Sequence, residues 1–276
     1  MNYHKIMLSI IAKEQGNNTV PNLLLHSCCA PCSSHVIDCL TKYFNITILY
    51  YNPNIEPHEE YLKRKEEEIR FINEYNNTNK LDIIDCDYDN ELYHKTIKGL
   101  EGCKEGGERC FKCYELRLEY TAKKAQELDY DYFGTTLTVS PYKNSNKLNE
   151  IGEMLEEKYK IKYLFSDFKK NNGYKHSIEM SKDYNLYRQD YCGCIYSKVE
   201  KDKKVKNKNG LYDELIMNIR GDMFNIANTH EVYVEITGDK NLKKEWELDG
   251  FILLPDNCDG KIGNIYHQYF DNELLI

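Results

Sequence analysis

The sequence predicts an α/β fold in which a parallel sheet is flanked by helices and is followed by a small C-terminal extension. Short apolar runs of strand length alternate with longer amphipathic segments as far as residue 197. This alternation is typical of a parallel sheet with crossover helices. After residue 197 the composition changes to a lysine-rich run with few apolar residues. We therefore expect one α/β domain with an appendage.

Four segments follow from this pattern. Residues 1–20 are expected to form a peripheral helix and a connector, and residues 21–197 the α/β domain that carries the chemistry. Residues 198–210 are expected to be a lysine-rich linker. Residues 211–276 are expected to be a small appended module with a strand at 231–237, in which we see no chemistry.

Within the α/β domain, each strand is expected to end in a turn that leads to a helix. The first strand, 23–25, precedes a helix capped by Ser33 or Ser34, and a later helix is capped by Ser145 or Asn146. A glycine-rich, site-forming loop with one helix is expected at 88–109. The other strands are expected at 46–51, 81–86, 131–135 and 163–166, and the other helices at 58–76, 110–129 and 175–187.

Composition restricts the class of protein. The net charge of −8 argues against a generally basic surface, so a nucleic-acid partner would need a local basic patch. We find neither a good signal peptide nor an apolar run of about 20 residues, and we expect a cytoplasmic protein. In that compartment the eleven cysteines indicate metal binding, redox catalysis or ordinary burial rather than a disulfide framework.

Seven of the cysteines form three closely spaced groups: Cys28-Cys29-x-x-Cys32, Cys110-x-x-Cys113 and Cys192-x-Cys194. The first group lies between a predicted strand and a predicted helix, which is where open α/β sheets bind ligands. A helix N-terminus also favours the thiolate, the form that binds metals. We therefore expect these thiols to converge on one region.

Counting narrows the kind of site. A cubane iron–sulfur cluster or a structural zinc takes four cysteines, which leaves three. The surplus suggests a second metal with an open position, or a redox-active pair. We expect core thiols at Cys39, Cys86 and Cys258. Cys103 is a ligand candidate, but a weaker one than the seven grouped cysteines. His26 is expected to be a hydrogen-bonded structural residue.

Five ordered motifs resemble the cobalamin-independent epoxyqueuosine reductase family, QueH, over about residues 20–197. They are LLLHSCCAPCSS, YYNPNIEPHEEYLKRK, GERCFKCYELRL, FGTTLTVSPYKN and GYKHSIEMSKDYNLYRQDYCGCIYS. The resemblance implies an adenine nucleotide α-hydrolase-like fold of the HUP type, with the CCAPC turn in place of a phosphate loop, so we expect no ATP binding. It implies reduction of epoxyqueuosine in tRNA to queuosine, the last step of queuosine biosynthesis.

The resemblance also implies cofactors and partners. It implies a 4Fe-4S cluster and an additional mononuclear metal, iron or zinc. The ligands would be Cys28, Cys29, Cys110, Cys113, Cys192 and Cys194, with Cys32 as a seventh. The partners would be tRNA carrying epoxyqueuosine and an external low-potential electron donor, without a membrane.

Polar turns supply candidates for substrate contact. Catalytic candidates, as proton donors or substrate holders, are Tyr142, Lys143, Tyr187 and Arg188. Candidate phosphate contacts are Lys169, Lys170, Lys175 and Arg188, which the 198–208 lysine run would assist.

Two other functions stay open at this point. One is a tRNA sulfurtransferase or disulfide reductase on the same fold, which would need ATP or a reactive pair such as Cys29 and Cys32. The other is a non-catalytic, zinc-stabilised binding module, which the surplus cysteines disfavour.

Overall fold

A computed structural model describes residues 1–203, 234–236 and 250–252. The chain divides into two compact units, Met1–Lys201 and Asp202–Ile276. In the first unit, five parallel strands form one sheet in the order β3-β2-β1-β4-β5. The predicted α/β fold is confirmed, and this strand order is that of the doubly wound nucleotide-binding folds.

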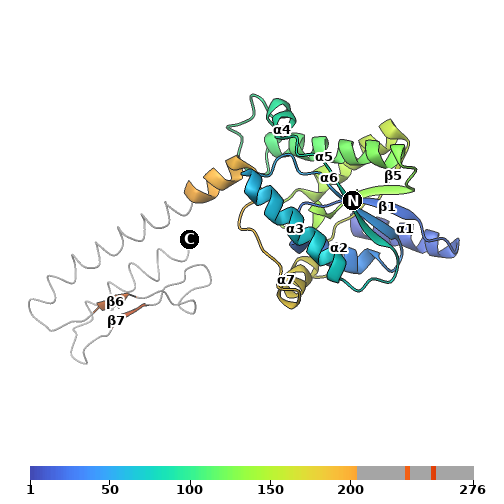
Figure 1. The fold of residues 1–276 in the computed structure, drawn as a ribbon, viewed down its shortest axis with the longest axis horizontal. Helices are drawn as coiled ribbons and strands as arrows, with labels where there is room; N and C mark the ends of the chain where they lie inside the picture. The colour runs from blue at the N-terminus through green and yellow to red at the C-terminus, as the bar shows by residue number, and fades with distance from the viewer. Residues whose placement is uncertain (204–233, 237–249, 253–276) are drawn as a thin grey trace, which may run out of the picture. The chain divides into compact units, whose positions relative to one another are not determined.

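The strands and helices alternate along the first unit as predicted (Figure 1). The strands are β1 (Asn22–His26), β2 (Asn45–Tyr50), β3 (Leu81–Asp85), β4 (Tyr132–Thr135) and β5 (Lys162–Tyr163). The helices are α1 (Tyr3–Gly16), α2 (Ala30–Leu40), α3 (His58–Glu74), α4 (Asn90–Thr96), α5 (Glu108–Glu127), α6 (Ser145–Tyr159) and α7 (Gly173–Asp183), with a 3-10 turn η1 (Thr136–Val139). Residues 195–203 are also helical.

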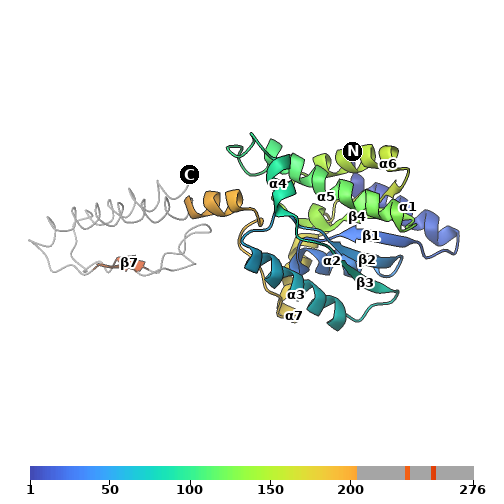
Figure 2. The same ribbon diagram turned by 45° about the horizontal axis from the view of Figure 1, so that its top comes forward.

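The central strand β1 is buried on both faces, and its side chains alternate between two apolar clusters. Leu23 and Leu25 pack into a cluster with residues of α1, α2, α3 and α7. Leu24 packs on the opposite side with residues of α5 and α6. Figure 2 shows α5 and α6 above the sheet, and α2, α3 and α7 below it. The sheet is therefore the middle layer of three.

The order of the strands reverses beside β1, which pairs with β2 on one side and β4 on the other. In open α/β sheets, ligands bind at this topological switch point, beyond the carboxyl ends of the strands. The chain leaving β1 there is His26-Ser27-Cys28-Cys29. The fold thus brings the first cysteine group to the position that this architecture reserves for a site.

Both predicted helix caps were wrong by a few residues. Helix α2 begins at Ala30, with Pro31 in its first turn, a position that proline favours. The Ser33 and Ser34 hydroxyls consequently lie inside the helix and donate to the carbonyls of Ala30 and Pro31. Helix α6 is capped by Asn144, whose side-chain oxygen accepts from the Lys147 backbone N–H at 3.0 Å.

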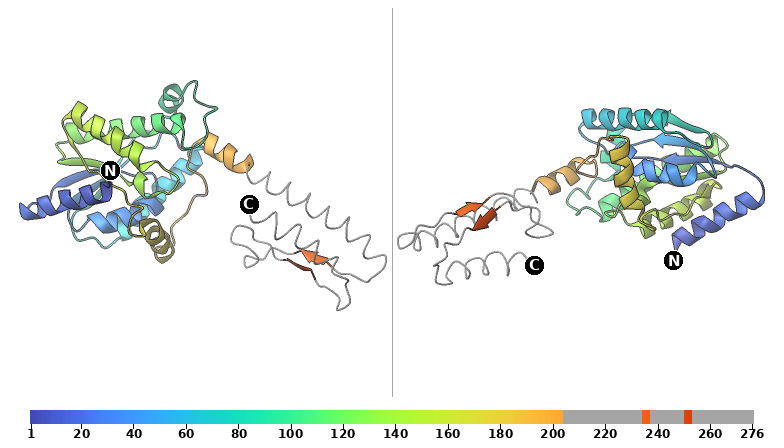
Figure 3. Two further views of the ribbon diagram at one scale, coloured as in Figure 1. Left: turned by 180° about the vertical axis from the view of Figure 1, so that it is seen from behind. Right: turned by 90° about the horizontal axis from the view of Figure 1, so that it is seen from below.

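In the second unit the structure describes one antiparallel pair, β6 (Val234–Ile236) with β7 (Gly250–Ile252). Strand β6 lies inside the segment predicted as a strand, 231–237. Residues 198–203, predicted as the start of a linker, are helical, and the finer division of the chain into four segments stays a prediction. Figure 3 shows the first unit from behind and from below.

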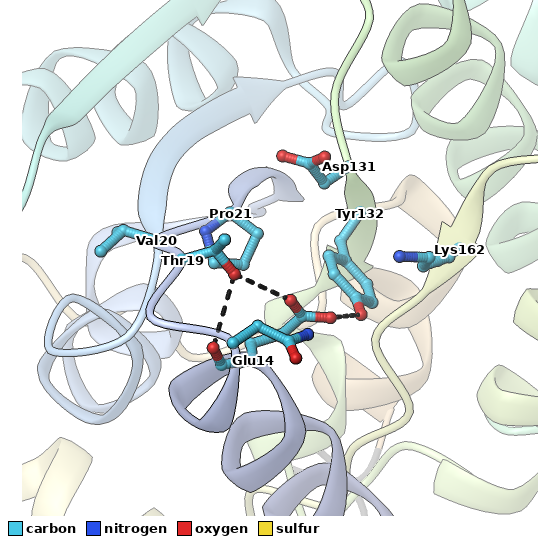
Figure 4. A pocket seen from close by; sticks show the side chains of 8 residues that line it. Glu14, Thr19, Val20, Pro21, Asp131, Tyr132 and Lys162 are labelled. Carbon is cyan, nitrogen blue, oxygen red and sulfur yellow. Dashed lines mark hydrogen bonds between the residues drawn. The ribbon is translucent and has the colours of Figure 1, made fainter.

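A polar pocket of about 450 Å³ lies at the amino ends of β1 and β4, away from the cysteine edge. In it the Glu14 carboxylate accepts hydrogen bonds from the Tyr132 hydroxyl at 2.6 Å and the Thr19 hydroxyl at 3.2 Å (Figure 4). Asp131 in turn accepts from the Asn22 backbone N–H at 2.8 Å. These lining groups hold α1 against the sheet.

Candidate metal centre

Cys28, Cys29 and Cys32 form a compact trio in the turn after β1. Their sulfur atoms all lie within 4.8 Å of one another, and the Cys28 and Cys29 sulfurs are 3.6 Å apart. Within residues 1–203, 234–236 and 250–252 this is the one set of three potential ligands found so close together. Cys29 is extended and forms the N-cap of α2. Strand end and helix start together direct the three thiols to one point.

Contacts within the trio favour the thiolate form of Cys28. The pKa of Cys28 lies well below its usual value because the thiols of Cys29 and Cys32 donate to its sulfur. The same bond to Cys28 raises the pKa of Cys29 to about 12 and that of Cys32 above its usual range. Metal binding requires deprotonated cysteines, so this arrangement suits the exchange of thiol protons for a metal ion.

The other four cysteines gather from the start of α5 and the segment after α7. Burial, together with the nearby Cys192 and Cys194, raises the pKa of Cys110 to about 11. Burial likewise raises the pKa of Cys113 to about 12, although Arg117 acts in the opposite direction. Cys113 and Cys194 also share a small buried cluster with Tyr93 and Ile97. The four thiols are therefore neighbours, as the sequence predicts.

Gly193 sits between Cys192 and Cys194 and fixes their turn. Its φ of +137° is a conformation that other residues rarely adopt. A Cβ atom there would lie 3.0 Å from a carbon of Ile55 and 3.2 Å from a guanidinium nitrogen of Arg64. Arg64, buried, donates to the Cys192 carbonyl at 3.1 Å and pairs with Glu60 at 2.7 Å. Helix α3 thus clamps the backbone that carries this cysteine pair.

Two further buried arginines approach the same thiols from α5. Arg109 pairs with Glu200 at 2.9 Å and donates to the carbonyls of Glu101 and Cys103, so it ties down the glycine-rich loop. Arg117 donates to His26 at 3.1 Å and to the Asn52 side-chain oxygen at 2.6 Å. Burial, together with the charge of Arg117, lowers the pKa of His26 to about 3. His26 is therefore a neutral, hydrogen-bonded residue of the kind predicted.

Lys143 brings a positive charge to both thiol groups. Burial acts to lower its pKa, but the thiols of Cys192, Cys28 and Cys32 outweigh that effect and hold the pKa well above its usual value. The adjacent Tyr142 is 76% exposed. A charged ammonium thus lies near both thiol groups, and an exposed aromatic ring precedes it in the chain.

Comparisons with known proteins agree with this geometry. Residues 23–200 match the family "Epoxyqueuosine reductase QueH". The chain belongs to the QueH family. The reductase of Staphylococcus epidermidis is 44% identical over 76% of this chain and 90% of its own length. Those of Streptococcus pyogenes and Staphylococcus aureus are 39% and 42% identical, over 80% and 75% of this chain and 93% and 89% of their own. The predicted family and oxidoreductase activity are confirmed.

Tyr187 and Arg188, two predicted candidates in this QueH chain, bind protein groups. The Tyr187 hydroxyl donates to Glu60 at 3.0 Å, which places it beside the Glu60–Arg64 pair. Arg188 donates to the Ser181 hydroxyl at 2.8 Å and to the Ser177 carbonyl at 3.3 Å. Both contacts stabilise the segment that leads to Cys192. The hydrogen bonds of these two side chains therefore go to other protein groups and not to the thiols.

Sequence reasoning missed the buried arginines and Gln189. The Gln189 amide donates to the Cys29 sulfur at 2.8 Å, and its amide oxygen is buried without a hydrogen-bond partner among the described residues. A helical-spacing argument could have found Arg117, since it follows Cys113 by one turn of α5. Gln189 gives no such signal, because its contact joins segments 160 residues apart.

Cys39 and Cys86 behave as packing residues in this QueH chain. Cys39, on α2, packs against the first apolar cluster, and burial raises its pKa to about 11. Burial also raises the pKa of Cys86 to about 11, and its side chain packs against the second apolar cluster. Cys103 lies in the glycine-rich loop, and Cys258 lies outside the described residues. Among the described helices, none is both long and apolar enough to cross a membrane.

Proposed function

We propose that this chain reduces the epoxide of epoxyqueuosine in tRNA to queuosine, using a 4Fe-4S cluster and one additional metal ion held by its seven grouped cysteines. The observation that carries the proposal is the meeting of two thiol groups of different spacing at the switch point of the sheet in a QueH-family chain. The spacing suggests which group holds which cofactor.

The compact trio fits a single ion. Thiolates bound at about 2.3 Å to one tetrahedral ion lie about 3.8 Å from each other. The 3.6 Å between the sulfurs of Cys28 and Cys29 is close to that value. Sulfur ligands favour iron or zinc over the hard cations. Three thiols on a four-coordinate ion leave one position for substrate, which a structural site would not need.

The four other thiols fit a cluster. In the described part of the chain, no three of Cys110, Cys113, Cys192 and Cys194 lie within 4.8 Å of one another, unlike the trio. A cubane needs this wider spacing because each thiolate binds a different iron. Four is also the number of cysteine ligands that a 4Fe-4S cluster binds.

Removal of the epoxide oxygen to leave an alkene consumes two electrons and two protons and releases water. A cluster held by the four wider-spaced cysteines would supply low-potential electrons one at a time, and an ion held by the trio would supply Lewis-acid chemistry toward the C–O bond. An external low-potential donor replaces the electrons. The protein must then supply protons, orientation and a site shielded from solvent.

Lys143 is the best candidate to bind the epoxide oxygen. Its pKa is held above the usual value by Cys192, Cys28 and Cys32, so the ammonium stays protonated at neutral pH. A fixed cation stabilises the negative charge that develops on oxygen as the C–O bond breaks. Tyr142, 76% exposed beside it, offers a ring on which a flipped base can stack.

The tRNA backbone would be held around this site. Lys170, Lys175 and Arg188 are exposed and follow β5 or flank α7, on the path to the second thiol group. Each phosphate contact makes tRNA binding more salt-dependent. Removal of the lysine run at 198–208 should flatten the salt dependence, and an unchanged slope would end that part of the proposal. A tRNA substrate makes the cytoplasm the expected compartment.

The test is direct conversion. Anaerobically reconstituted protein is mixed with tRNA containing epoxyqueuosine and a chemical low-potential reductant, and the nucleosides are analysed by mass spectrometry. We expect queuosine from the wild type and from Cys39→Ser, and none from Cys113→Ser or Cys29→Ser. Unchanged epoxyqueuosine with a protein that retains its iron and sulfide would contradict the proposal.

A further inference from the structure

Arg117 is a buried cation on the face of α5 that carries Cys113. Only 1% of its surface is exposed, which makes it one of the largest fully buried side chains of the described residues. Its Nη1 atom lies 3.9 Å from the Cys113 sulfur, one helical turn away. The thiols of Cys113, Cys28 and Cys192 all act to raise its pKa, against the effect of burial. Arg117 therefore lies in the electrostatic field of both thiol groups.

No carboxylate of the described residues lies within ion-pair distance of Arg117, whereas the other two buried arginines each have one. Arg64 pairs with Glu60, and Arg109 pairs with Glu200. The nitrogen and oxygen side-chain partners of Arg117 are the His26 imidazole and the Asn52 amide, neither of which is a carboxylate. A buried charge is strongly disfavoured unless it is paired. The fold thus holds a positive charge whose natural counter-ion is a set of bound thiolates.

The guanidinium is held rigidly. Its Nε atom lies 3.1 Å from Nε2 of His26, and that imidazole is itself held by the Thr135 hydroxyl at 3.0 Å and the Tyr51 carbonyl at 3.2 Å. Asn52 accepts from Arg117 and donates its amide to the Ser27 carbonyl at 2.8 Å, next to Cys28. Residues at the ends of β1, β2 and β4 therefore fix the orientation of the guanidinium, so that its Nη1 atom is directed toward Cys113. A fixed cation needs no rearrangement when the charge beside it changes.

We propose that Arg117 is a positioning residue that serves as the fixed counter-ion of the metal centre and raises the reduction potential of the cluster. The cluster gains one negative charge with each electron it takes from the donor. A buried cation at this distance stabilises the reduced form more than the oxidised form. This inference rests on the proposed function, because it requires the cluster to be bound by Cys113 and its neighbours.

The experiment is a redox titration of reconstituted wild type, Arg117→Lys, Arg117→Gln and Arg70→Gln, followed by visible and electron paramagnetic resonance spectra. Iron and sulfide per chain are measured in parallel. Arg70 is the matched control, since it is an arginine of α3 whose ion pairs with Glu67 and Glu74 are at the surface. Arg117→Lys retains the charge and loses the forked hydrogen bonds.

We expect the Gln variant to be reduced at a more negative potential than the wild type, by at least a tenfold change in the reduction equilibrium, about 59 mV for one electron. The Lys variant should lie between the two, and the Arg70 variant should equal the wild type. If Arg117→Gln fails to retain iron and Arg117→Lys retains it, the charge requirement is also supported.

Two results would overturn the inference. One is a Gln variant whose potential equals that of the wild type. The other is equal loss of the cluster in the Lys and Gln variants, which would mean that the shape of the guanidinium matters and its charge does not. Failure of the proposed function would look different, because the wild type itself would then take up no iron and sulfide.

Discussion

The Lys169 ammonium donates a hydrogen bond to the backbone carbonyl of Lys143, over 3.1 Å, and a second to the Ser145 hydroxyl at the same distance. The segment after β5 is thereby tied to the turn before α6. Lys143 is the residue whose ammonium faces both thiol groups. Lys169, predicted as a phosphate contact, therefore also holds the residue proposed to bind the epoxide oxygen.

Replacing Lys143 by Met should lower kcat/KM for epoxyqueuosine reduction by about 100-fold or more, the usual effect of removing one preorganised donor from a developing oxyanion. Arg should restore part of the activity because it keeps the charge. Iron and sulfide content should not change, since Lys143 is not a proposed ligand. Steady-state kinetics together with metal analysis check this, and a Met variant with wild-type kcat/KM would refute the assigned role.

Replacing Lys169 by Met should lower kcat/KM by about tenfold, because a misplaced Lys143 is less damaging than an absent one. Lys158→Met is the matched control, since that lysine pairs with Glu119 at the surface of α6. In the double variant with Lys143→Met, the Lys169 substitution should have little further effect on kcat/KM. Additive losses would mean that Lys169 acts on its own, for example on a tRNA phosphate.

Substitutions in the two thiol groups should cause the loss of different cofactors, which metal analysis can distinguish. Cys32→Ala should lose the additional ion and keep about four irons and four sulfides per chain, whereas Cys194→Ala should lose the cluster. The reason is the spacing, which is compact in the trio and wider in the other group. Cys39→Ala is the control and should match the wild type. Loss of the whole cluster from Cys32→Ala would reverse the assignment.

Glu68 should make the protein less stable as the pH rises. Burial raises its pKa to about 8. Neither carboxylate oxygen has a hydrogen-bond partner among the described residues. Because the pKa is higher in the folded than in the unfolded chain, stability is greatest below the unfolded pKa, about 4.3, and is lost as the pH rises toward 8.

Glu68→Gln should therefore be more stable than the wild type at pH 8, by more than about 1 kcal/mol, and its stability should change less between pH 5 and 8. Urea denaturation at several pH values under anaerobic conditions measures this. Glu66→Gln, an exposed neighbour on α3, should follow the wild type. Destabilisation by Glu68→Gln at pH 8 would show that the carboxylate is required in its charged form.

The sequence predicted the sheet because each strand is a short apolar run between turn signals, as in Leu23–Leu25 of β1. It predicted the grouping of the cysteines because strand ends and helix starts meet at one edge. Helix α2 begins before the predicted serines because Pro31 favours the first turn, and Asn144 caps α6 one residue before Ser145.

The arginine partners and Gln189 lay beyond sequence reasoning. Arg117, His26 and Asn52 come together from three elements only once the sheet is assembled. Whether a buried arginine has a carboxylate partner depends on such long-range contacts, as for Arg109 and Glu200, 91 residues apart. Periodicity and local propensity carry no information about them.

The central claim is that this chain holds a redox centre, and the iron, zinc and acid-labile sulfide content of anaerobically purified protein tests it most directly. We predict about four irons and four sulfides per chain, with one additional iron or zinc. One zinc per chain, with no sulfide and no colour after reconstitution, would contradict the account and indicate a zinc-stabilised binding module.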